Sequence, residues 1–398
     1  MLKVWIIGVK GSVASTTIVG IKALQQGLFP TTGLLTETAL FNGISLPPLT
    51  EMEFGGSDLK AGSFFDAAWA TLRDGIYPAQ LLKDLQPALE GVTVRPCTAV
   101  RCGRTVESIA ETPQAAMSYR QIAEQTAKHI LEFKGSDDCV VVNLASTEPP
   151  VTMGPQHATL EQFEKAIDEN SPHISSSMLN AYCALKNGIP FVNFTPSVGA
   201  DIPALEELAL KTRTPHCGKD GKTGETLVKT ALAPMFLYRN LRILGWYGTN
   251  ILGNLDGKVL ENPDNKATKI QTKDAVLTKA VGYSPVSKVA IDYFPPVGED
   301  KIAWDFIVFE GFGGHRMRMQ FTWEGCDSIL AAPLVIDLIR LVQFTKHLGL
   351  PGLQKQLGLF FKSPMGSDVV NLFEQYEHLR QWVDKVKTGA VAKETARV

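Results

Sequence analysis

The sequence predicts an α/β protein built on a doubly wound parallel sheet, with a smaller α+β unit inserted before the C-terminal helices. Three observations indicate this fold. The chain opens with a strand, a glycine turn and a helix; strand-like and helical runs then alternate to about residue 215; longer strands with alternating polarity follow. Such alternation is typical of parallel sheets. We therefore divide the 398 residues into residues 1–215 with 327–398, and an inserted unit at residues 216–326.

Composition and charge narrow the class of protein. Hydrophobic residues make up 44% of the chain, charged residues 20%, and the formal net charge is −2. This charge gives no electrostatic reason to expect binding to nucleic acid or an anionic membrane, and we find no run that could span a bilayer. The six cysteines form no Cys-x-x-Cys pair, and the histidines lack zinc-ligand spacing. We expect a cytoplasmic protein with free thiols.

The first strand, residues 3–7, leads through a glycine turn into a helix at residues 15–26. The turn places Gly8, Gly11 and Ala14 in a Gly-x-x-Gly-x-x-Ala spacing, with Ser12 beside the second glycine. Glycines let the backbone approach a pyrophosphate, a small alanine allows close helix packing, and the helix N-terminus favours negative charge. The turn therefore predicts a Rossmann-type dinucleotide site, with an ordinary tight turn as the alternative.

The next segments continue the doubly wound pattern. Residues 29–62 are rich in Thr, Gly and Pro and are interpreted as a loop with short elements, which contains Asp58 near its end. Asp58 is expected to accept hydrogen bonds from a ribose, or else to cap the following helix. The predicted helices and strands of this half, in order, are helices 63–72, 78–89 and 117–133, strand 139–144, helix 177–186 and strand 190–193.

The strand at residues 139–144 is a continuous apolar run, which is typical of a fully buried parallel strand. It ends in a polar loop that begins Ala145-Ser146-Thr147. Ligands bind beyond the carboxyl ends of such strands. We therefore expect Ala145 and Thr147 to flank the same crevice as the first glycine turn.

The inserted unit combines a helix with longer strands of alternating polarity. The pattern predicts a sheet with one packed face, followed by two helices that return to the first unit. The predicted segments are helix 226–237, strands 243–247, 288–294, 304–309 and 316–323, and helices 328–348 and 368–387.

A glycine-punctuated polar segment precedes the helix at residues 226–237. In it, Thr223, Gly224, Glu225 and Thr226 are placed to present backbone N–H groups to a phosphate at a helix N-terminus. Asp220, just upstream, is expected to lie near the cofactor. The alternative is a solvated turn in which Thr223 caps the helix.

Residues 250–273 concentrate amides, carboxylates and lysines. Asn254 and Asp256 precede Gly257, so they are either turn residues or groups that bind substrate hydroxyls. Lys269 and Lys273 lie one helical turn apart and therefore face one way. They form either a solvated surface or a site in which the pKa of a lysine is lowered for proton transfer.

Three further residues are candidates for the same site. Lys301 lies in Gly298-Glu299-Asp300-Lys301, and Lys362 follows two phenylalanines, which is unusual for a solvated lysine. Asp327 precedes a long apolar helix, so helix capping is its alternative role.

These motifs resemble those of the inositol-1-phosphate synthase family, also called inositol-3-phosphate synthases under the other ring numbering. The resemblance is strongest from about residue 218 to residue 362, and the chain looks like a compact bacterial member. The motifs that carry it, in an order that the family shares, are residues 250–257, 269–273, 297–301, 327–333 and 362–364.

The resemblance implies an NAD-dependent isomerase of inositol and phospholipid biosynthesis that converts glucose 6-phosphate into inositol 1(3)-phosphate. In this family NAD oxidises C5 of the open-chain sugar, the acidified C6 proton is lost, the enol attacks the C1 aldehyde, and NADH reduces the ring ketone. The enolate and alkoxide need positive charge in a dry site, and lysines supply it without a metal. The family also implies a homotetramer whose interface is built by the inserted sheet.

Carried over by position, the resemblance gives each lysine a role. Lys269 and Lys362 serve the C5 hydroxyl and the developing oxyanions. Lys273 and Lys301 hold phosphate and carbonyl oxygens, and together with Lys362 they are expected to form one phosphate pocket with residues 223–226.

The remaining polar residues are carried over in the same way. The resemblance implies that Asn254 and Asp256 bind substrate hydroxyls. It also implies that Asp220 and Asp327 lie near the nicotinamide and the groups that support it.

Three departures from the family leave the substrate open. The first glycine turn lacks the longer Gly-rich, Asn-containing pattern of eukaryotic members, Thr223 stands where serine is common, and the chain is shorter. The alternatives are an enzyme that cyclises another sugar phosphate, a simple dehydrogenase with net turnover of NAD, and an inactive NAD-binding regulator.

Overall fold

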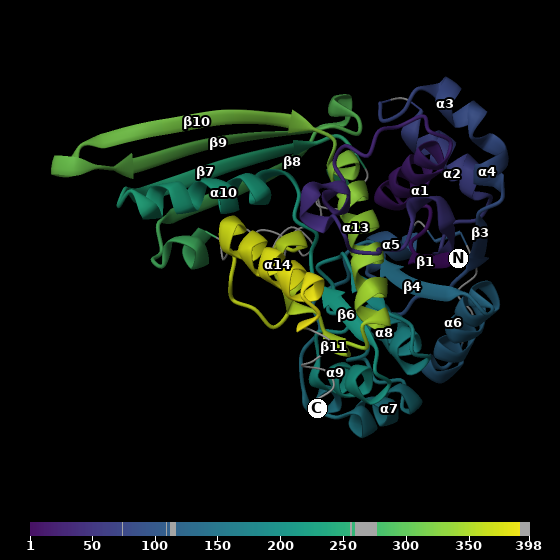
Figure 1. The fold of residues 1–398 in the computed structure, drawn as a ribbon. Helices are drawn as coiled ribbons and strands as arrows, with labels where there is room; N and C mark the ends of the chain where they lie inside the picture. Colours follow the sequence, from purple (N-terminus) through teal and green to yellow (C-terminus); the bar gives the residue numbers. More distant parts are fainter. Residues whose placement is uncertain (74, 109, 112–116, 255–256, 259–276, 391–398) are drawn as a thin grey trace.

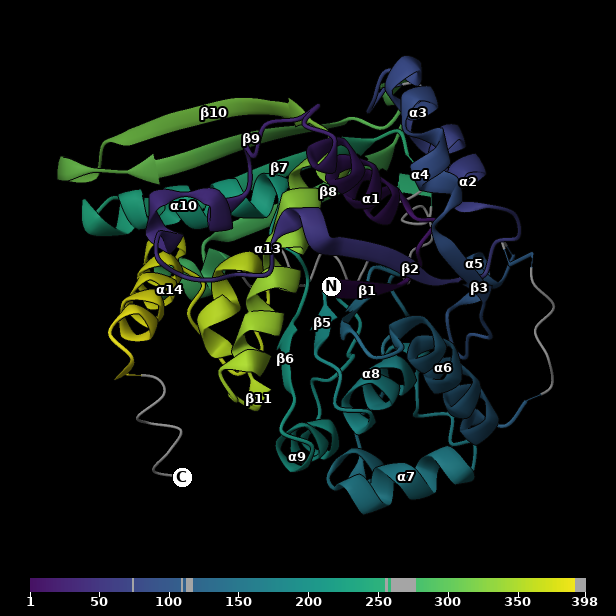
Figure 2. The ribbon, with the colours of Figure 1, turned by 45° about the vertical axis from the view of Figure 1, so that its right-hand side comes forward.

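The computed structural model describes residues 1–73, 75–108, 110–111, 117–254, 257–258 and 277–390. Two sheets organise this part of the chain (Figure 1). The larger sheet and its helices form the body of the molecule, and the smaller sheet projects from the body as an arm with one long helix along its face (Figures 1 and 2).

The body contains a seven-stranded sheet in the order β11-β6-β5-β4-β1-β2-β3, and every pair of neighbouring strands is parallel. The strand order reverses between β1 and β4, which is the switch point of a doubly wound fold. The predicted fold class is therefore confirmed. The strands are β1 Leu2–Ile7, β2 Met52–Asp58, β3 Thr93–Pro96, β4 Asp138–Asn143, β5 Phe191–Asn193, β6 Pro215–Gly218 and β11 Gly352–Leu353.

Helices cover both faces of this sheet because its strands carry apolar side chains on both faces. In β1, Val4 and Ile6 join the core shared with α1 (Ser12–Gln25) and α13 (Asp327–His347). Trp5 and Ile7 join the core on the opposite face, formed with α6, α7, α8 and α9. The other helices of the body are α2 Phe64–Leu72, α3 Ala79–Asp84, α4 Gln86–Glu90, α5 Arg104–Ser108, α6 Tyr119–Lys134, α7 Leu160–Asp168, α8 Ser176–Lys186, α9 Pro203–Lys211 and α14 Leu372–Lys387.

Helix α13 corrects one expectation from sequence. By length and hydropathy alone this helix could cross a bilayer, although we expected no such run. In the structure 78% of its most apolar window is buried inside the protein. It packs against α1 and against strands β4, β5 and β6, so its apolar character is that of a core helix.

The arm is a four-stranded mixed sheet in the order β10-β9-β7-β8. β7 runs parallel to β8 and antiparallel to β9, and β9 runs antiparallel to β10. Helix α10 packs on one face through a core that includes Phe236, Trp246 and Ile307. The elements of the arm are α10 Gly224–Tyr238, β7 Arg242–Leu252, β8 Val286–Tyr293, β9 Lys301–Glu310 and β10 Arg316–Gly325.

The face of the arm beneath α10 changes character along its length. Ile243 and Trp246 of β7 are buried and apolar, whereas Asn250 on the same face is buried and polar. β9 shows the same change, from Ile307 to Lys301. The polar end of this face lies where the arm meets the body, so it points to a site between the two sheets.

Residues 29–62, predicted as a loop with short elements, contain three short 3-10 helices and end in strand β2, which the sequence did not identify as a strand. Two glycines in the strand, Gly55 and Gly56, hide it from sequence patterns because glycine is depleted from strands. A Cβ atom at Gly56 would lie 2.1 Å from the Ile6 carbonyl oxygen, and one at Gly55 would lie 2.7 Å from the Phe133 ring. Close packing against β1 and α6 therefore requires glycine in this strand.

A buried lysine connects the segment before α10 to α14. Lys222 is 3% exposed, and its Nζ donates a hydrogen bond to Oε1 of Gln375. Burial lowers the pKa of Lys222 from 10.5 to about 7. Between these two values the unfolded chain binds a proton at this lysine and the folded chain does not. The contribution of Lys222 to stability therefore rises with pH across this window.

We expect the Lys222→Met variant to lose this rise. The measured quantity is the free energy of unfolding of the wild type minus that of the variant. This difference should increase by up to about 3 kcal/mol between pH 7 and pH 9.5. Urea unfolding at the two pH values measures it, with Lys211→Met on an exposed position of α9 as the control. If the difference in free energy of unfolding between wild type and variant were the same at both pH values, Lys222 would be charged in the folded protein.

Candidate active site

The carboxyl ends of the parallel strands open onto two adjoining cavities. The first, called here the strand-end cavity, has a volume of about 150 Å³ and lies at the ends of β1, β2 and β4. The second, the lysine cavity, has a volume of about 410 Å³ and extends to the polar end of the arm. The two form one crevice at the switch point, where open α/β sheets bind ligands. Both are lined by Gly11, Lys60, Leu144, Ala145 and Ser146.

The glycine turn after β1 is built for close approach of the backbone. Gly8 has a φ of +80°, and a Cβ atom there would lie 2.8 Å from the Cα of Ala145. The N–H of Gly11 donates to the Gly8 carbonyl at 3.0 Å, and α1 starts at the next residue. Gly8 and Gly11 therefore line the strand-end cavity at a helix N-terminus, where anions are stabilised. Ala14 is fully buried behind the turn.

Asp58 is the last residue of β2, so it does not cap a helix. It lines the strand-end cavity, and its carboxylate accepts backbone N–H bonds from Lys10 at 2.8 Å and from Lys60 at 3.0 Å. The Lys10 side chain returns to the same loop and donates to the carbonyls of Lys60, Ala61 and Gly62. Asp58 therefore fixes the turn, and as an ionised carboxylate it has further acceptor capacity for a ligand of this cavity.

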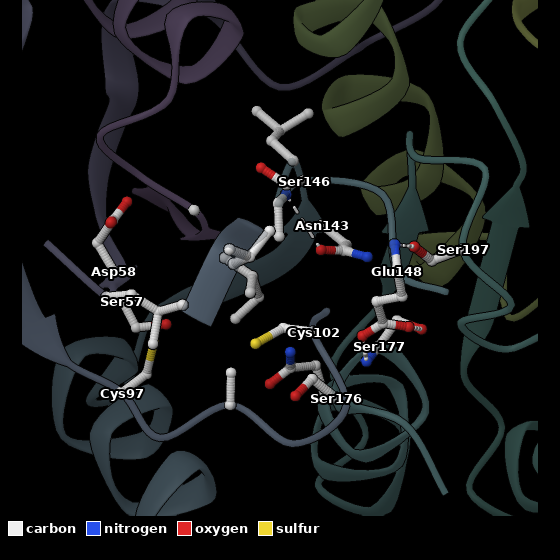
Figure 3. Close-up of a pocket in the computed structure, with 18 of the residues that line it drawn as sticks. Ser57, Asp58, Cys97, Cys102, Asn143, Ser146, Glu148, Ser176, Ser177 and Ser197 are labelled. Atoms are coloured by element: carbon white, nitrogen blue, oxygen red, sulfur yellow. Dashed lines mark hydrogen bonds between the residues drawn. The ribbon is translucent and has the colours of Figure 1, made fainter. Parts of the chain in front are cut away.

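Figure 3 shows the strand-end cavity, with Asp58 on one side and Glu148, Ser177 and Ser197, which were not predicted as site residues, on the other. Glu148 accepts hydrogen bonds from the backbone and hydroxyl of Ser177, at 2.6 and 2.5 Å, and its own N–H donates to Ser197. Burial is the largest influence on Glu148 and raises its pKa. Burial also raises the pKa of Cys97 to about 12 and that of Cys102 to about 11, so both thiols stay neutral at the cavity wall.

The lysine cavity brings together predicted residues from distant parts of the chain. They come from the glycine turn, the loop after β4, the segment around α10, the end of β7, the start of β9, the start of α13 and the loop after η7 (Lys355–Phe360). The predicted residues that line it are Gly11, Ser12, Ala145, Thr147, Asp220, Thr223, Glu225, Thr226, Asn254, Lys301, Asp327 and Lys362.

Two ion pairs in the lysine cavity hold its described lysines in place. Lys362 Nζ lies 3.0 Å from Asp220 Oδ1, and the Lys362 backbone N–H donates to the Asp220 carbonyl. Lys301 Nζ lies 3.1 Å from Asp327 Oδ2. Each lysine is therefore a hydrogen-bond donor held at the cavity wall by a neighbouring carboxylate.

The N-terminus of α10 lies against one of these pairs. Thr223 is the N-cap residue, but its hydroxyl makes no capping bond to the helix. Gly224 has a φ of +56°, and a Cβ atom there would lie 3.1 Å from Asp327 Oδ1 and 3.2 Å from Lys301 Nζ. The start of α10 therefore lies against both the Lys301 ammonium and the Asp327 carboxylate, and a helix N-terminus beside an ammonium is a candidate site for an anion.

Three predicted residues have side chains that are already engaged within the protein. Ser12 Oγ lies 2.8 Å from Ser328 Oγ and 3.3 Å from a carboxylate oxygen of Glu299, a lining residue that the sequence analysis did not select. Asn254 Oδ1 accepts the Gly257 N–H at 3.2 Å, so Asn254 is a turn residue that also lines the cavity. The Glu225 carboxylate points beneath α10 and pairs with Lys229 at 2.6 Å.

Three predicted residues lie outside the described part of the chain: Lys269, Lys273 and Asp256. Their predicted roles, and the shared phosphate pocket in so far as it includes Lys273, remain predictions. Within the described residues, Lys301, Lys362, Thr223 and Thr226 line one cavity.

Comparison with known proteins identifies the family. The sequence profile of myo-inositol-1-phosphate synthase matches residues 2–384. The chain belongs to the myo-inositol-1-phosphate synthase family. Inositol-3-phosphate synthase 1 of Bacteroides thetaiotaomicron is 35% identical over 387 residues, which cover 92% of this chain and 89% of the relative. A probable inositol 3-phosphate synthase isozyme of Arabidopsis thaliana is 29% identical, over 87% of this chain and 75% of the relative.

Solved structures share the fold. Inositol-3-phosphate synthase from Caenorhabditis elegans superimposes with a TM-score of 0.88 at 21% identity, covering 97% of this chain and 86% of that one. A myo-inositol-1-phosphate synthase-related protein from Thermotoga maritima superimposes with a TM-score of 0.78 at 24% identity, covering 96% and 98%. The arm and body of this chain are thus arranged as in solved structures of inositol-phosphate synthases.

Family membership makes this chain an enzyme that uses NAD. The crevice fits that cofactor on its own geometry. The glycine turn leaves room where a Cβ atom would strike Ala145, the α1 N-terminus lies beside it, and two joined cavities offer space on both sides. A dinucleotide with its pyrophosphate at the turn would extend one half into each cavity.

Proposed function

We propose that this enzyme converts glucose 6-phosphate into inositol 1(3)-phosphate, with NAD reduced and reoxidised within each turnover. The observation that carries the proposal is the lysine cavity, in which two charged lysines and a helix N-terminus surround the far end of a dinucleotide site. Such a cavity suits a phosphorylated substrate that passes through anionic intermediates. The Bacteroides relative is named as an inositol-3-phosphate synthase, which supports the same assignment.

In this proposal the strand-end cavity orients the cofactor. Bound NAD would supply the hydride acceptor for oxidation at C5 of the open-chain sugar and, as NADH, the hydride donor for the ring ketone. Gly8 and Gly11 admit the pyrophosphate, and Asp58 accepts from a ribose. Ala145 and Thr147 lie on the same wall of the crevice as the glycine turn, with Lys269 on the other wall. Asp220 and Asp327 orient Lys362 and Lys301 beside the nicotinamide end.

The lysines of the cavity stabilise charge on the substrate. Lys362 donates to the C5 oxygen and to the oxyanion that develops after loss of the C6 proton. Lys301 and the N–H groups of residues 223–226 hold the phosphate, and Asn254 binds a hydroxyl. The cavity lies between the body and the arm, so bound substrate is shielded from water and the enolate from premature protonation.

The residues outside the described part of the chain complete the proposed site. Lys269 acts with Lys362 at C5, Lys273 joins the phosphate pocket, and Asp256 binds a substrate hydroxyl. These roles rest on the order of the family motifs along the chain and on the described end of the same segment, Asn254, which lines the cavity.

We also propose a homotetrameric, cytoplasmic enzyme of inositol and phospholipid biosynthesis. The outer face of the arm supports an oligomer, because Trp304 is 36% exposed and Val286 is 77% exposed there.

The seven-stranded sheet includes β6, which ends at Gly218. We therefore propose that the catalytic unit begins just after this strand and ends near residue 326.

Incubation of the purified enzyme with glucose 6-phosphate and a catalytic amount of NAD tests the function. Phosphorus and proton NMR should show inositol phosphate accumulating well beyond the amount of NAD present. A product other than inositol phosphate would establish another sugar-phosphate activity, and no turnover with bound NAD would favour an inactive regulator.

A further inference from the structure

A short antiparallel pairing joins the segment before α10 to the end of η7 and the loop after it. This pairing, called here the site ladder, runs between residues 218–222 and residues 360–365. Its backbone bonds include the one from the Lys362 N–H to the Asp220 carbonyl, at 2.6 Å. The side chains of the same two residues form an ion pair at the wall of the lysine cavity. The site ladder therefore sets where this ion pair lies.

Lys222 ends the site ladder on the α10 side, directly before the N-cap residue Thr223. Its backbone N–H donates to the Phe360 carbonyl at 2.9 Å. Its side chain does not line the lysine cavity, and the amine donates a hydrogen bond to Oε1 of Gln375 in α14. Gln375 is held in turn, because its Nε2 donates to the Val369 carbonyl at 2.7 Å. One buried lysine thus ties the site ladder to α14.

The surroundings of the Lys222 amine are apolar. Lys222 lines a third cavity, of about 570 Å³, together with side chains from α1, α10, α13, η7 and α14 that carry no charge. Tyr77 is the only other titratable side chain among the described residues of this cavity, and burial raises its pKa to about 12, so it stays neutral. Gln375 Oε1 is the only hydrogen-bond partner of the Lys222 amine in the described part of the chain. A neutral amine is satisfied there, whereas an ammonium has more donors than this one acceptor can take.

The place of Lys222 in the chain connects this contact to the site. Asp220 lies just before it, and residues 223–226 at the start of α10 follow it directly. We propose that Lys222 is a positioning residue for the sugar phosphate in the lysine cavity, which acts through the Asp220–Lys362 pair and the start of α10. The inference rests on the proposed function, because it takes the anionic substrate of that cavity as its ligand.

Protonation of the Lys222 amine undoes this positioning, because a buried ammonium gains free energy by moving toward water. Burial lowers the pKa of Lys222 to about 7, so the change falls near neutral pH. Above that pH the amine is neutral and the site ladder is held in place. Below it the fraction of neutral, competent protein falls about tenfold per pH unit, and the apparent affinity for the substrate falls with it.

Steady-state kinetics with glucose 6-phosphate and saturating NAD, at pH 8 and pH 6, test this role. The kcat/KM of the wild type should fall about tenfold from pH 8 to pH 6, as one protonation near pH 7 requires. Lys222→Met has no amine to protonate. At pH 8 it should be about tenfold slower than the wild type, the scale of one lost hydrogen bond. Between the two pH values it should change no more than about twofold, which is the effect of the substrate phosphate alone.

Sulfate gives a readout that does not depend on turnover. It remains a dianion from pH 6 to pH 8, so its binding beside lysines would ordinarily hold steady or strengthen as the pH falls. Calorimetric titration of the NAD-loaded wild type should instead show sulfate binding about tenfold weaker at pH 6 than at pH 8, because the site ladder loosens. Lys222→Met should bind sulfate equally well at both pH values.

Two further variants separate positioning from general destabilisation. Gln375→Glu keeps the side-chain shape and gives the protonated Lys222 an ionic partner, so the site ladder should stay in place. Its kcat/KM at pH 6 should remain within about twofold of its value at pH 8. This result decides the matter even if Lys222→Met does not fold. Lys346→Met is the control, because Lys346 Nζ donates to the Arg213 carbonyl at 2.9 Å, away from the lysine cavity, and its loss should leave the wild-type pH profile.

The outcomes are distinct. A wild type with the same pH dependence as Lys222→Met would overturn the inference and leave the proposed function standing. A loss of activity at pH 6 that persists in Gln375→Glu would also overturn it. A wild type that binds sulfate with the expected pH dependence but does not use glucose 6-phosphate would overturn the proposed function alone. A wild type that neither uses glucose 6-phosphate nor binds sulfate would overturn both.

Discussion

Replacing Lys362 with methionine is expected to lower kcat/KM for glucose 6-phosphate by about 100-fold or more. Its ammonium lies 3.0 Å from Asp220 Oδ1 at the wall of the lysine cavity, where we place the C5 oxygen and the enolate. A fixed charged donor in a site without water typically contributes this much to transition-state stabilisation. Methionine keeps the apolar stem and removes only the charge, so NAD binding should persist.

Lys355→Met is the matched control for this result. Lys355 is the first residue of η7, the short helix that precedes Lys362, but it is exposed and does not line the cavity. Its replacement should leave kcat/KM unchanged. A Lys362→Met variant that stays within about threefold of the wild type, well below the usual effect of such a donor, would remove Lys362 from the chemistry.

Alanine at Gly8 is expected to weaken NAD binding by at least about tenfold. The left-handed φ alone costs roughly 1–2 kcal/mol for a residue with a Cβ atom. That atom would also lie 2.8 Å from the backbone of Ala145, so the loop that lines both cavities would have to shift. Calorimetric titration with NAD measures the effect, and the free energy of unfolding should fall as well.

Gly27→Ala separates the two causes. Gly27 follows α1 with a φ of +70°, and a Cβ atom there would meet nothing within 4 Å. This variant should lose stability through backbone strain alone and bind NAD normally. If both variants bind NAD equally well, the contact between Gly8 and Ala145 has no part in the cofactor site.

Most strands and helices of the body could be predicted from local patterns in the sequence. The apolar run of β4 and the strand–turn–helix opening at β1 identify parallel strands, because both faces of such strands are buried. Strand β2 escaped this reasoning because its two glycines resemble a loop in composition. Their cause is contact with Ile6 and Phe133, which lie in other elements and are invisible from local sequence.

The sequence likewise predicted many residues of the candidate site but not the contacts between them. The ion pairs of Lys301 with Asp327 and of Lys362 with Asp220 join residues that were selected singly, while the pairing itself depends on how α13 and η7 fold back. The sequence pointed to Asn254 and, for its backbone N–H, to Glu225, whereas the buried contact between the Glu225 carboxylate and Asn250 was not predicted.

A period of two from Trp246 to Leu252 does place Asn250 on one face of β7. A polar residue on a face that also carries a tryptophan looks like an interruption of the apolar pattern until α10 is seen to lie over it. Glu299 and Ser328 escaped for a similar reason, because each contacts Ser12 across more than two hundred residues of sequence.

The most direct test of the central claim follows the hydride itself. Glucose 6-phosphate deuterated at C5 should yield inositol phosphate that keeps the deuterium, with no NADH accumulating in proportion to product, because the same cofactor removes and returns the hydride. The NMR spectrum of the product and the absorbance of NADH report both quantities in one reaction. Stoichiometric release of NADH, or loss of the deuterium to added unlabelled NADH, would contradict catalytic use of NAD and indicate a simple dehydrogenase.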